Sequence, residues 1–359
     1  MNMDARHGEG SERTLTFVVS TGRSGSTALS KVISMHPDLL SLNELYSSVP
    51  DAELLTDAPL SGAEFWEHLG SPNANTDRLL RSGVPIPEII YDDGAPERRR
   101  YSAATTGIPA LCLMVLPHLT DDPDAMLDEL EPEVRSWPTR PAPRQWWALF
   151  DALADRFGKP RAVVERSGFS LNRVTRLREC FPEARFVHLF RDGADCALSM
   201  SRHGAFRLLP VLQEAAARCG LESALELTPE HAAQLPEDLA ALLQGEFDPS
   251  LILDRDIPLA AFGALWSGMV VDGMERLAAV PADRLMSLSY EALLRDPAAE
   301  LGRLAEFVGV EPRPEWLTEG GGLLHSASAG SARKLPPEDL AALREACAPG
   351  TNALRDVKV

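Results

Sequence analysis

The sequence has little of several features that define common classes of protein. Its 359 residues include five cysteines, odd in number and scattered, with no CxxC or Cys/His ligand spacing. Neither a disulfide framework nor a zinc site is therefore predicted. No apolar run approaches the roughly 18 residues of a membrane span, and residues 1–13 are polar, without a signal-type apolar segment. We expect a soluble protein in a reducing, cytoplasmic setting.

Basic residues are also scarce. Lys and Arg number 35 against 53 Asp and Glu, a formal net charge of −18. Nucleic acid and anionic membranes repel such a chain, so neither is predicted as a partner. The acidic excess gathers in residues 121–133 and 221–260, which we interpret as solvated faces. A small anionic ligand could still bind in a local pocket of arginines and backbone amides.

One stretch near the N-terminus reads as strand, turn and helix. Residues 15–19 (LTFVV) are typical of a buried parallel strand, residues 21–27 (TGRSGST) are small residues around one arginine, and helical spacing follows. In this order the backbone N–H groups of the turn and of the helix N-terminus make an anion cradle. A plain strand–helix turn is the alternative, but Arg23, Ser26 and Thr27 stand where a phosphate needs donors.

The same loop departs from the usual nucleoside-triphosphate loop. The pattern GxxxxGK[ST] would place a glycine five residues before Gly25, where Ser20 stands, and a lysine where Ser26 stands. The loop therefore predicts phosphate binding and argues against ordinary magnesium–nucleotide chemistry. No cluster of metal ligands is predicted.

A second strand also ends in arginine and glycine. Residues 185–190 (RFVHLF) lead into Arg191, Asp192 and Gly193, and a helix is predicted from about 194 to 201. Arg191 and Ser199 could reach one phosphate only if it lies beside that helix. Other predicted strands are residues 39–45, 162–165 and 284–289, and predicted helices include 145–157, 171–180 and 262–277.

Three motifs together resemble the sulfotransferase family that uses 3′-phosphoadenosine 5′-phosphosulfate (PAPS). Residues 20–29 (STGRSGSTAL) resemble its 5′-phosphosulfate loop, in the form with arginine. Residues 186–202 (FVHLFRDGADCALSMSR) resemble its 3′-phosphate segment, and residues 289–310 are similar to its YEDL…P…FLG stretch. The order and spacing are specific, and the likeness is greatest to the branch with tyrosylprotein and many bacterial sulfotransferases.

The resemblance implies an α/β, P-loop-like three-layer fold, with a central parallel sheet flanked by helices, plus helical insertions. Residues 14–359 would form a single domain after a disordered tail at residues 1–13. Insertions at about 45–145 and 205–260 would shape the acceptor pocket. The implied function moves the sulfuryl group of PAPS, as cosubstrate and without metal, to a hydroxyl of a small organic acceptor.

The resemblance also implies roles for single residues. The family pattern HPD…E fits residues 36–44 and makes Glu44 the general base, while Arg166 fits a basic residue that acts on the sulfuryl oxygens. The residues implied to bind the donor are Arg23, Ser24, Gly25, Ser26, Thr27, Arg191, Ser199, Gly330 and Arg333. Ser331 replaces a usual asparagine, and no Lys-Thr-His element is present, which favours Glu44 over a histidine base.

Several alternatives stay open at this stage. A P-loop small-molecule kinase or a non-catalytic nucleotide-binding protein would share parts of the pattern. Residues 320–322 (GGG) are predicted to form a flexible joint, and residues 325–334 a loop that closes over a ligand or a disordered linker. The acceptor, the oligomeric state, and the roles of His325 and of residues 221–260 are not predicted.

Overall fold

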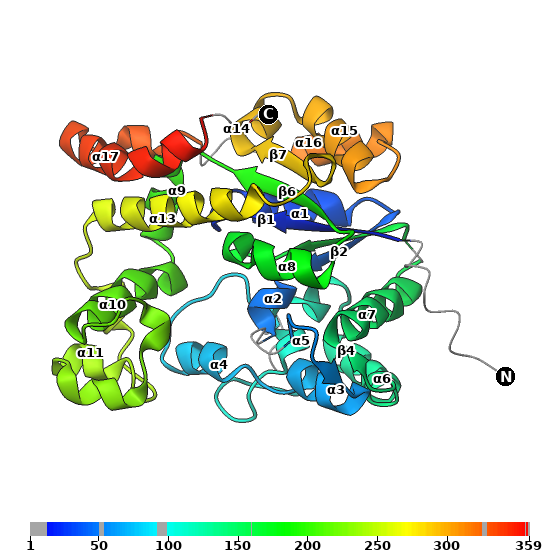
Figure 1. Cartoon of the computed structure of the whole chain (residues 1–359), viewed down its shortest axis with the longest axis horizontal. Helices are drawn as coiled ribbons and strands as arrows, with labels where there is room; N and C mark the ends of the chain where they lie inside the picture. Colours follow the sequence, from blue (N-terminus) through cyan, green and yellow to red (C-terminus); the bar gives the residue numbers. More distant parts are fainter. Residues whose placement is uncertain are drawn as a thin grey trace.

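The computed structural model describes residues 13–49, 54–91, 99–158, 160–324, 329–355 and 357. A five-stranded sheet lies at the centre, with parallel strands in the order β2-β5-β1-β6-β7 (Figure 1). These strands are β1 (Thr14–Val19), β2 (Leu39–Asn43), β5 (Ala162–Arg166), β6 (Arg185–Phe190) and β7 (Leu285–Ser289). A separate antiparallel pair is formed by β3 (Pro59–Leu60) and β4 (Arg140–Pro141).

Helices make up most of the rest of the described chain. The longer helices are α1 (Ser26–Ser34), α3 (Gly62–Gly70), α4 (Ala74–Arg81), α6 (Pro123–Arg135), α7 (Ala142–Arg156), α8 (Val174–Cys180), α9 (Gly193–Met200), α10 (Gly204–Arg218), α13 (Leu259–Leu277), α15 (Pro297–Val308), α16 (Pro314–Leu323) and α17 (Pro337–Ala353). Short helices are α2 (Leu45–Ser48), α5 (Ala110–Met114), α11 (Glu237–Ala241), α12 (Ser250–Leu253) and α14 (Tyr290–Arg295). The predicted α/β fold with a helix-flanked parallel sheet is confirmed.

Strand β1 shows how the sequence builds two hydrophobic layers. Successive side chains of a strand point to opposite faces of the sheet. Phe17 and Val19 therefore join the core formed with α7 and α8, whereas Val18 joins the core formed with α1, α15 and α16. The apolar run without polar alternation follows from this burial on both faces.

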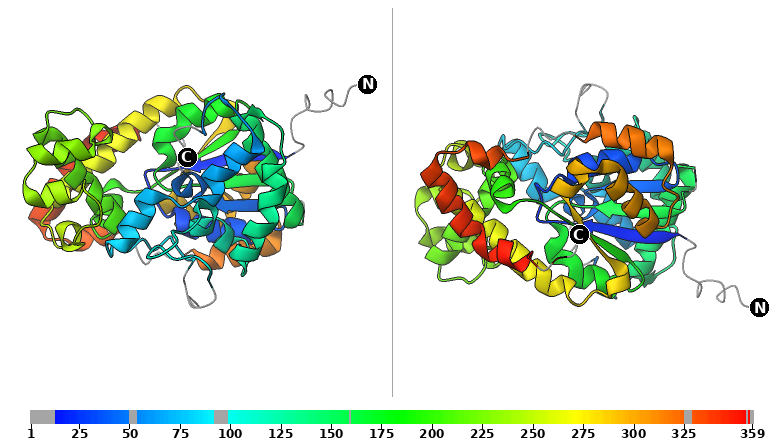
Figure 2. Two further views of the ribbon diagram at one scale, coloured as in Figure 1. Left: turned by 90° about the horizontal axis from the view of Figure 1, so that it is seen from below. Right: turned by 90° about the horizontal axis from the view of Figure 1, so that it is seen from above.

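A third core lies beside the sheet. It contains side chains of α9, α13 and α17, among them Cys196, Trp266 and Leu343. Figure 2 shows α10 to α12 beyond one end of the sheet, next to this layer. Val211, Phe247 and Ile252 from this insertion form a small core of their own with Val84. The two predicted insertions, 45–145 and 205–260, therefore contact each other.

Two expectations about flexible segments have different outcomes. The predicted disordered tail, residues 1–13, lies outside the described residues except for Arg13. The predicted joint at residues 320–322 is wrong, because these glycines belong to α16. A Cβ atom at Gly320 would lie 2.6 Å from Val32 Cγ1 of α1, so glycine here permits two helices to approach closely.

Within the described part of the chain, none of the helices is both long enough and apolar enough to cross a membrane.

Candidate active site

The predicted site residues follow the carboxyl ends of neighbouring strands. Glu44 comes directly after β2, Arg166 ends β5, Arg23 lies in the turn after β1, and Arg191 follows β6. The sheet order β2-β5-β1-β6 therefore arranges them in a row, although they are far apart in the sequence. The carboxyl edge of an open parallel sheet is where such folds bind ligands.

These side chains share one cavity of about 390 Å³, here called the donor cavity. The residues that the sequence predicts for the site and that line this cavity are Arg23, Gly25, Ser26, Thr27, Glu44, Arg166, Arg191 and Ser199. Ser24 is the exception in the β1–α1 turn, because its buried hydroxyl donates to the Gly22 carbonyl at 3.2 Å. Gly330 and Arg333 do not line the cavity, and His325 lies outside the described residues.

The β1–α1 turn needs glycine at two points. Gly22 and Gly25 have φ angles of 80° and 88°, in the left-handed region that glycine tolerates. A Cβ atom at Gly25 would lie 2.3 Å from the Tyr290 ring, so no larger residue fits. Arg23 also adopts a positive φ, 58°, which is uncommon for a side chain of this size and is concentrated at functional sites.

Helix α1 presents its N-terminus to the donor cavity. Gly25 is the N-cap residue and provides no side-chain cap, so the first backbone N–H groups keep their hydrogen-bonding capacity. Ser26 and Thr27, the first residues of α1, line the cavity with these groups. This arrangement can bind an anion by backbone N–H donors and by the helix dipole.

Glu44 and Arg166 form a buried ion pair at one end of the cavity. Arg166 Nη1 contacts Glu44 Oε1, and Arg166 Nε donates to Ser30 Oγ at 2.7 Å. The second carboxylate oxygen, Glu44 Oε2, accepts hydrogen bonds from the Gly168 N–H and from Ser47 Oγ, both at 2.7 Å. The positions of both side chains are therefore fixed from several directions.

Glu165, the residue before Arg166, is a second buried carboxyl group. Its hydrogen bond from Ser167 Oγ is 2.5 Å long. Burial raises the pKa of Glu165 to about 7; the Ser167 hydrogen bond opposes this shift, and the nearby Glu44 charge adds to it. Because successive strand residues face opposite sides, Glu165 points away from the side of β5 that carries Arg166.

Arg23 is held by an acidic residue that sequence reasoning missed. Its Nη1 lies 2.8 Å from Glu88 Oε1, and its Nε donates to Ser199 Oγ at 3.2 Å. The other Glu88 oxygen, Oε2, lies 2.9 Å from His203 Nε2. Burial favours a higher pKa for Glu88, but the hydrogen bond and charge of His203 and the charge of Arg23 outweigh it and lower the pKa to about 2.

Glu88 and His203 had no signal in the sequence. Glu88 lies in a proline-containing segment between α4 and α5, and His203 precedes α10, so no spacing links them. Glu88 belongs to the first insertion and meets His203 where its segment packs on the start of α10. An acidic side chain among phosphate-binding candidates is a feature that the family resemblance does not imply.

Arg191 lies between the β1 loop and the last strand. Its Nη1 donates to the Arg23 carbonyl at 3.3 Å, and its guanidinium carbon lies 5.1 Å from the centre of the Tyr290 ring. Its Nη2 is 3.5 Å from Asp195 Oδ2. The two arginine-bearing turns are therefore in direct contact.

Asp195 connects Arg191 to the late loop. Its two oxygens accept hydrogen bonds from the Gly330 N–H at 2.5 Å and the Ala332 N–H at 2.8 Å. The exposed Arg333 belongs to the short 3₁₀ helix that starts next to this anchor (Ser331–Lys334). Its implied role in binding the donor stays a prediction.

A parallel sheet whose first strand leads through a glycine-containing turn into an uncapped helix N-terminus is an arrangement by which α/β proteins bind phosphate. The family model of the sulfotransferase family matches residues 16–247, so the chain belongs to the sulfotransferase family. This match spans both arginine-bearing turns and Glu44. No curated protein sequence matches the chain. Among the described residues, no group of three or more His, Cys, Asp or Glu side chains is placed to hold a metal ion.

Three solved sulfotransferase structures are among those similar to this chain. The sulfotransferase domain from the curacin biosynthetic pathway is 14% identical, with 94% of this chain and 96% of that chain covered and a TM-score of 0.48. The sulfotransferase domain of the Synechococcus PCC 7002 olefin synthase is 17% identical, with coverage of 98% and 90% and a TM-score of 0.45. The sulfotransferase from Alicyclobacillus acidocaldarius is 16% identical, with coverage of 95% and 94% and a TM-score of 0.40.

Proposed function

We propose that this sulfotransferase moves the sulfuryl group from PAPS to a hydroxyl of a small organic acceptor. The observation that carries the proposal is the contact between the Arg23 and Arg191 turns within the cavity that also contains Glu44. Two adjacent arginine sites suit a donor with two separate phosphate groups. One guanidinium group can donate two parallel hydrogen bonds to the oxygens of one phosphate, so each arginine could bind one of the two groups.

The sheet order supports one orientation of the donor. Its 5′-phosphosulfate would bind at the β1–α1 turn, on Arg23, Ser26, Thr27 and the backbone N–H groups. Its 3′-phosphate would lie towards β6, with Arg191 and Ser199. The sulfuryl group would then point towards β5 and β2, where Arg166 and Glu44 lie.

The proposed reaction is an in-line displacement at sulfur. The acceptor oxygen forms a bond to sulfur while the bond from sulfur to the bridging oxygen breaks, and adenosine 3′,5′-bisphosphate leaves with that oxygen. Arg23 and the turn N–H groups would stabilise the charge on the bridging oxygen. Arg166 would attract the sulfuryl oxygens, and positioning would supply the remaining rate enhancement.

Glu44 would accept the proton of the acceptor hydroxyl. An ionised carboxylate offers about four acceptor positions. The contacts with Arg166, Gly168 and Ser47 use three of them, which leaves room for one further donor. A fixed carboxylate with one remaining position fits a general base, which contributes about 10²- to 10⁴-fold in rate.

The proposal includes the organisation of the chain. Residues 14–359 would act as a single domain, with the acceptor pocket shaped by the insertions at about 45–145 and 205–260. Ile86, Met114 and Phe206, which line the donor cavity, come from these insertions. A cytoplasmic location is also part of the proposal, and the five cysteines, all free in the structure, fit it.

Calorimetry with two nucleotides tests the donor. We expect adenosine 3′,5′-bisphosphate to bind more tightly than ATP with magnesium, because only the former carries a 3′-phosphate for Arg191. Sulfate transfer from PAPS to a panel of hydroxylated compounds, read by mass gain, tests the reaction. Preference for ATP with magnesium would favour a small-molecule kinase, and donor binding without transfer to any acceptor would favour a non-catalytic protein.

A further inference from the structure

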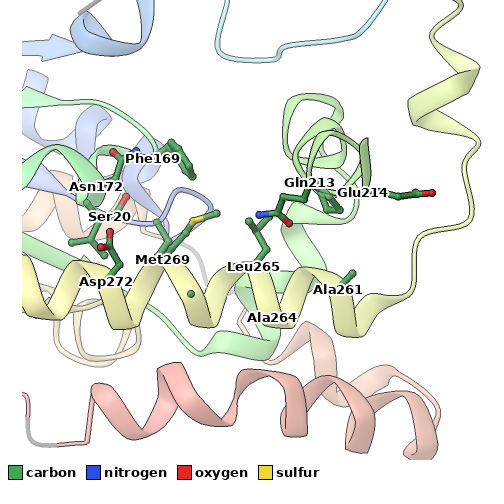
Figure 3. A pocket seen from close by; sticks show the side chains of 14 residues that line it. Ser20, Phe169, Asn172, Gln213, Glu214, Ala261, Ala264, Leu265, Met269 and Asp272 are labelled. Carbon is green, nitrogen blue, oxygen red and sulfur yellow. The ribbon is translucent and has the colours of Figure 1, made fainter. Parts of the chain in front are cut away.

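A second cavity of about 690 Å³ shares Phe169 with the donor cavity, and Figure 3 shows the side chains that line it. It is bounded by the turns after β1 and β5 on one side and by α10 and α13 on the other. We call it the side groove, and the residues used to define it are Phe169, Asn172, Gln213, Leu265, Gly268 and Met269. Its volume is within the range of small-molecule sites, about 300–1,000 Å³.

We propose that the side groove binds the apolar body of the acceptor while the acceptor hydroxyl lies at Glu44. The substrate class is an elongated, uncharged alcohol or phenol with an apolar chain or ring system. This inference rests on the proposed function, because it names the acceptor of the same reaction.

Phe169 borders both cavities, since it is among the lining residues of each. The residue before it, Gly168, donates its backbone N–H to Glu44 Oε2 at 2.7 Å. The proposed base is therefore hydrogen-bonded to the residue that precedes Phe169 in the wall of the side groove. Phe169 also has a φ of 59°, an unusual conformation for an aromatic residue, which directs the chain sharply after β5.

The wall between the cavities is aromatic. Phe169 packs edge-to-face on Phe206, with ring centres 6.3 Å apart. Phe206 in turn fills the space above Gly22, where a Cβ atom would lie 2.5 Å from its ring. A molecule that passes this wall would leave the polar donor cavity and meet aromatic surface.

The floor of the side groove is apolar. In Figure 3, Leu265 and Met269 rise from α13 into the space between Phe169 and Gln213. Ala264 and Gly268 on the same face of α13 are exposed and small, which makes room above the helix. Burying an apolar chain against such a surface is favourable, with about 25 cal/mol per Å² removed from water.

The charged groups at the edge of the side groove are already paired. Glu214 forms ion pairs with Arg218 and Arg255, each at 2.8 Å, and its carboxylate points away from the groove in Figure 3. Asp272 accepts from Arg276 at 2.8 and 2.9 Å. An uncharged ligand therefore fits better than an ion.

The polar groups that are left are amides. No hydrogen bond to the side chains of Asn172 or Gln213 is present within the described part of the chain, and both line the side groove. Each could form hydrogen bonds with one hydroxyl or carbonyl group on an otherwise apolar acceptor. The inferred class therefore extends to apolar molecules with a few neutral polar groups.

A series of straight-chain primary alcohols from 1-butanol to 1-decanol tests the inference by sulfate transfer from PAPS. We expect kcat/KM to rise about fourfold per added methylene, the gain for burying one CH₂ group, until the groove is filled. Ala264→Trp would fill the groove from an exposed position and should abolish this rise. Val271→Trp, on the same helix but outside the groove, is the matched control and should keep it.

Methyl NMR provides a readout that does not depend on catalysis. With methionine methyl groups labelled with ¹³C, and the Met269 signal assigned through Met269→Leu, we expect 1-decanol to shift that signal in the presence of adenosine 3′,5′-bisphosphate. Ala264→Trp should suppress the shift and Val271→Trp should not.

The inference is overturned by a rate independent of chain length, by an equal loss in the two tryptophan variants, or by an unmoved Met269 signal. Transfer to other hydroxylated compounds but to none of the alcohols would also overturn it and leave the proposed function intact. Failure of adenosine 3′,5′-bisphosphate to bind would instead contradict the proposed function.

Discussion

The two ends of the donor cavity hold their arginines differently. At the β5–β2 end, the side chains of Arg166 and Glu44 are 3% and 7% exposed, and both are fixed by further hydrogen bonds. At the β1 end, the side chains of Arg23 and Glu88 are 29% and 19% exposed, and Glu88 comes from an insertion rather than from the sheet. One pair is buried within the core fold, and the other borders the open cavity.

This difference suggests separate tasks for the two ends: the buried pair positions reacting groups, and the more exposed pair binds the ligand. Removing one partner of a buried ion pair costs about 3–5 kcal/mol of stability, so Arg166 and Glu44 hold each other in place before substrate binds. A partly exposed pair is worth only about 0–1 kcal/mol and can exchange its partner for a ligand at low cost. We infer that the reaction end is fixed before substrate arrives, whereas Arg23 exchanges Glu88 for the donor.

Glu44→Gln should produce the largest effect and tests the fixed end. We expect kcat to fall about 10²- to 10⁴-fold, because an amide cannot accept the proton, with little change in affinity for adenosine 3′,5′-bisphosphate. Steady-state kinetics and calorimetry measure the two quantities. Equal loss of both would remove Glu44 from the role of base.

Two matched variants separate chemistry from structure at this end. Ser47→Ala removes one hydrogen bond to Glu44 and keeps its carboxylate, so a much smaller loss of kcat is expected. Glu306→Gln, an exposed carboxyl group on α15, should leave kcat unchanged. Thermal unfolding of all three shows whether the fold is retained.

Arg191→Ala tests the contact between the two arginine turns. We expect affinity for adenosine 3′,5′-bisphosphate to fall about 10- to 100-fold, the worth of a charge-assisted hydrogen bond. The affinity for adenosine 5′-phosphate, which has no 3′-phosphate, should fall less in the same variant. Arg295→Ala, an exposed arginine on α14, is the control, and unchanged affinity in Arg191→Ala would contradict the assignment.

Glu165→Gln tests how far the fixed end depends on a neutral carboxyl group. Because burial raises the folded-state pKa of Glu165 to about 7, the folded protein keeps its proton at pH values where the unfolded chain loses it. Stability from this group is therefore complete below about pH 4.5 and is lost as pH rises to about 7. Urea unfolding measures this free energy. Between these pH values we expect the free energy of unfolding to fall more in the wild type than in Glu165→Gln, with a difference on the order of 2 kcal/mol.

The sequence was sufficient for the sheet and for the residues attached directly to it. Apolar runs doubly buried in the sheet predicted β1 and β6, and the residues after them, Arg23 and Arg191, followed from strand position alone. Glu44 was assigned through the family resemblance, and in the structure it directly follows β2. In each case the chemistry lies within a few residues of a strand, where local pattern fixes position.

The residues that sequence reasoning missed depend on contacts between distant segments. Glu88 and His203 meet because the segment before Glu88, in the first insertion, packs on the start of α10, and no spacing in the sequence predicts this contact. The prediction of a flexible joint at residues 320–322 was wrong for a related reason. Glycine there permits a close approach between α16 and α1, which no local pattern shows. Arg333 was assigned by motif, and its distance from the cavity depends on how the Asp195 anchor positions its loop.

Glu88→Gln gives the smallest expected effect and tests the exchangeable end. In the wild type the anionic donor must replace a carboxylate that already occupies Arg23 Nη1, and the two negative charges repel each other. Two like charges about 4 Å apart repel by about 1 kcal/mol in water, so the variant should bind adenosine 3′,5′-bisphosphate a few-fold more tightly, and the gain should shrink with added salt.

The opposite result would change the comparison between the two ends. If Glu88 holds Arg23 in its working position, as Asn43 and Ser30 hold Arg166, then Glu88→Gln would weaken binding and lower kcat together. Glu246→Gln, which removes the carboxylate of an exposed pair with Arg81, controls for a general loss of negative charge. Tighter binding in Glu88→Gln alone would mean that this acidic residue stands in for the donor while the cavity is empty.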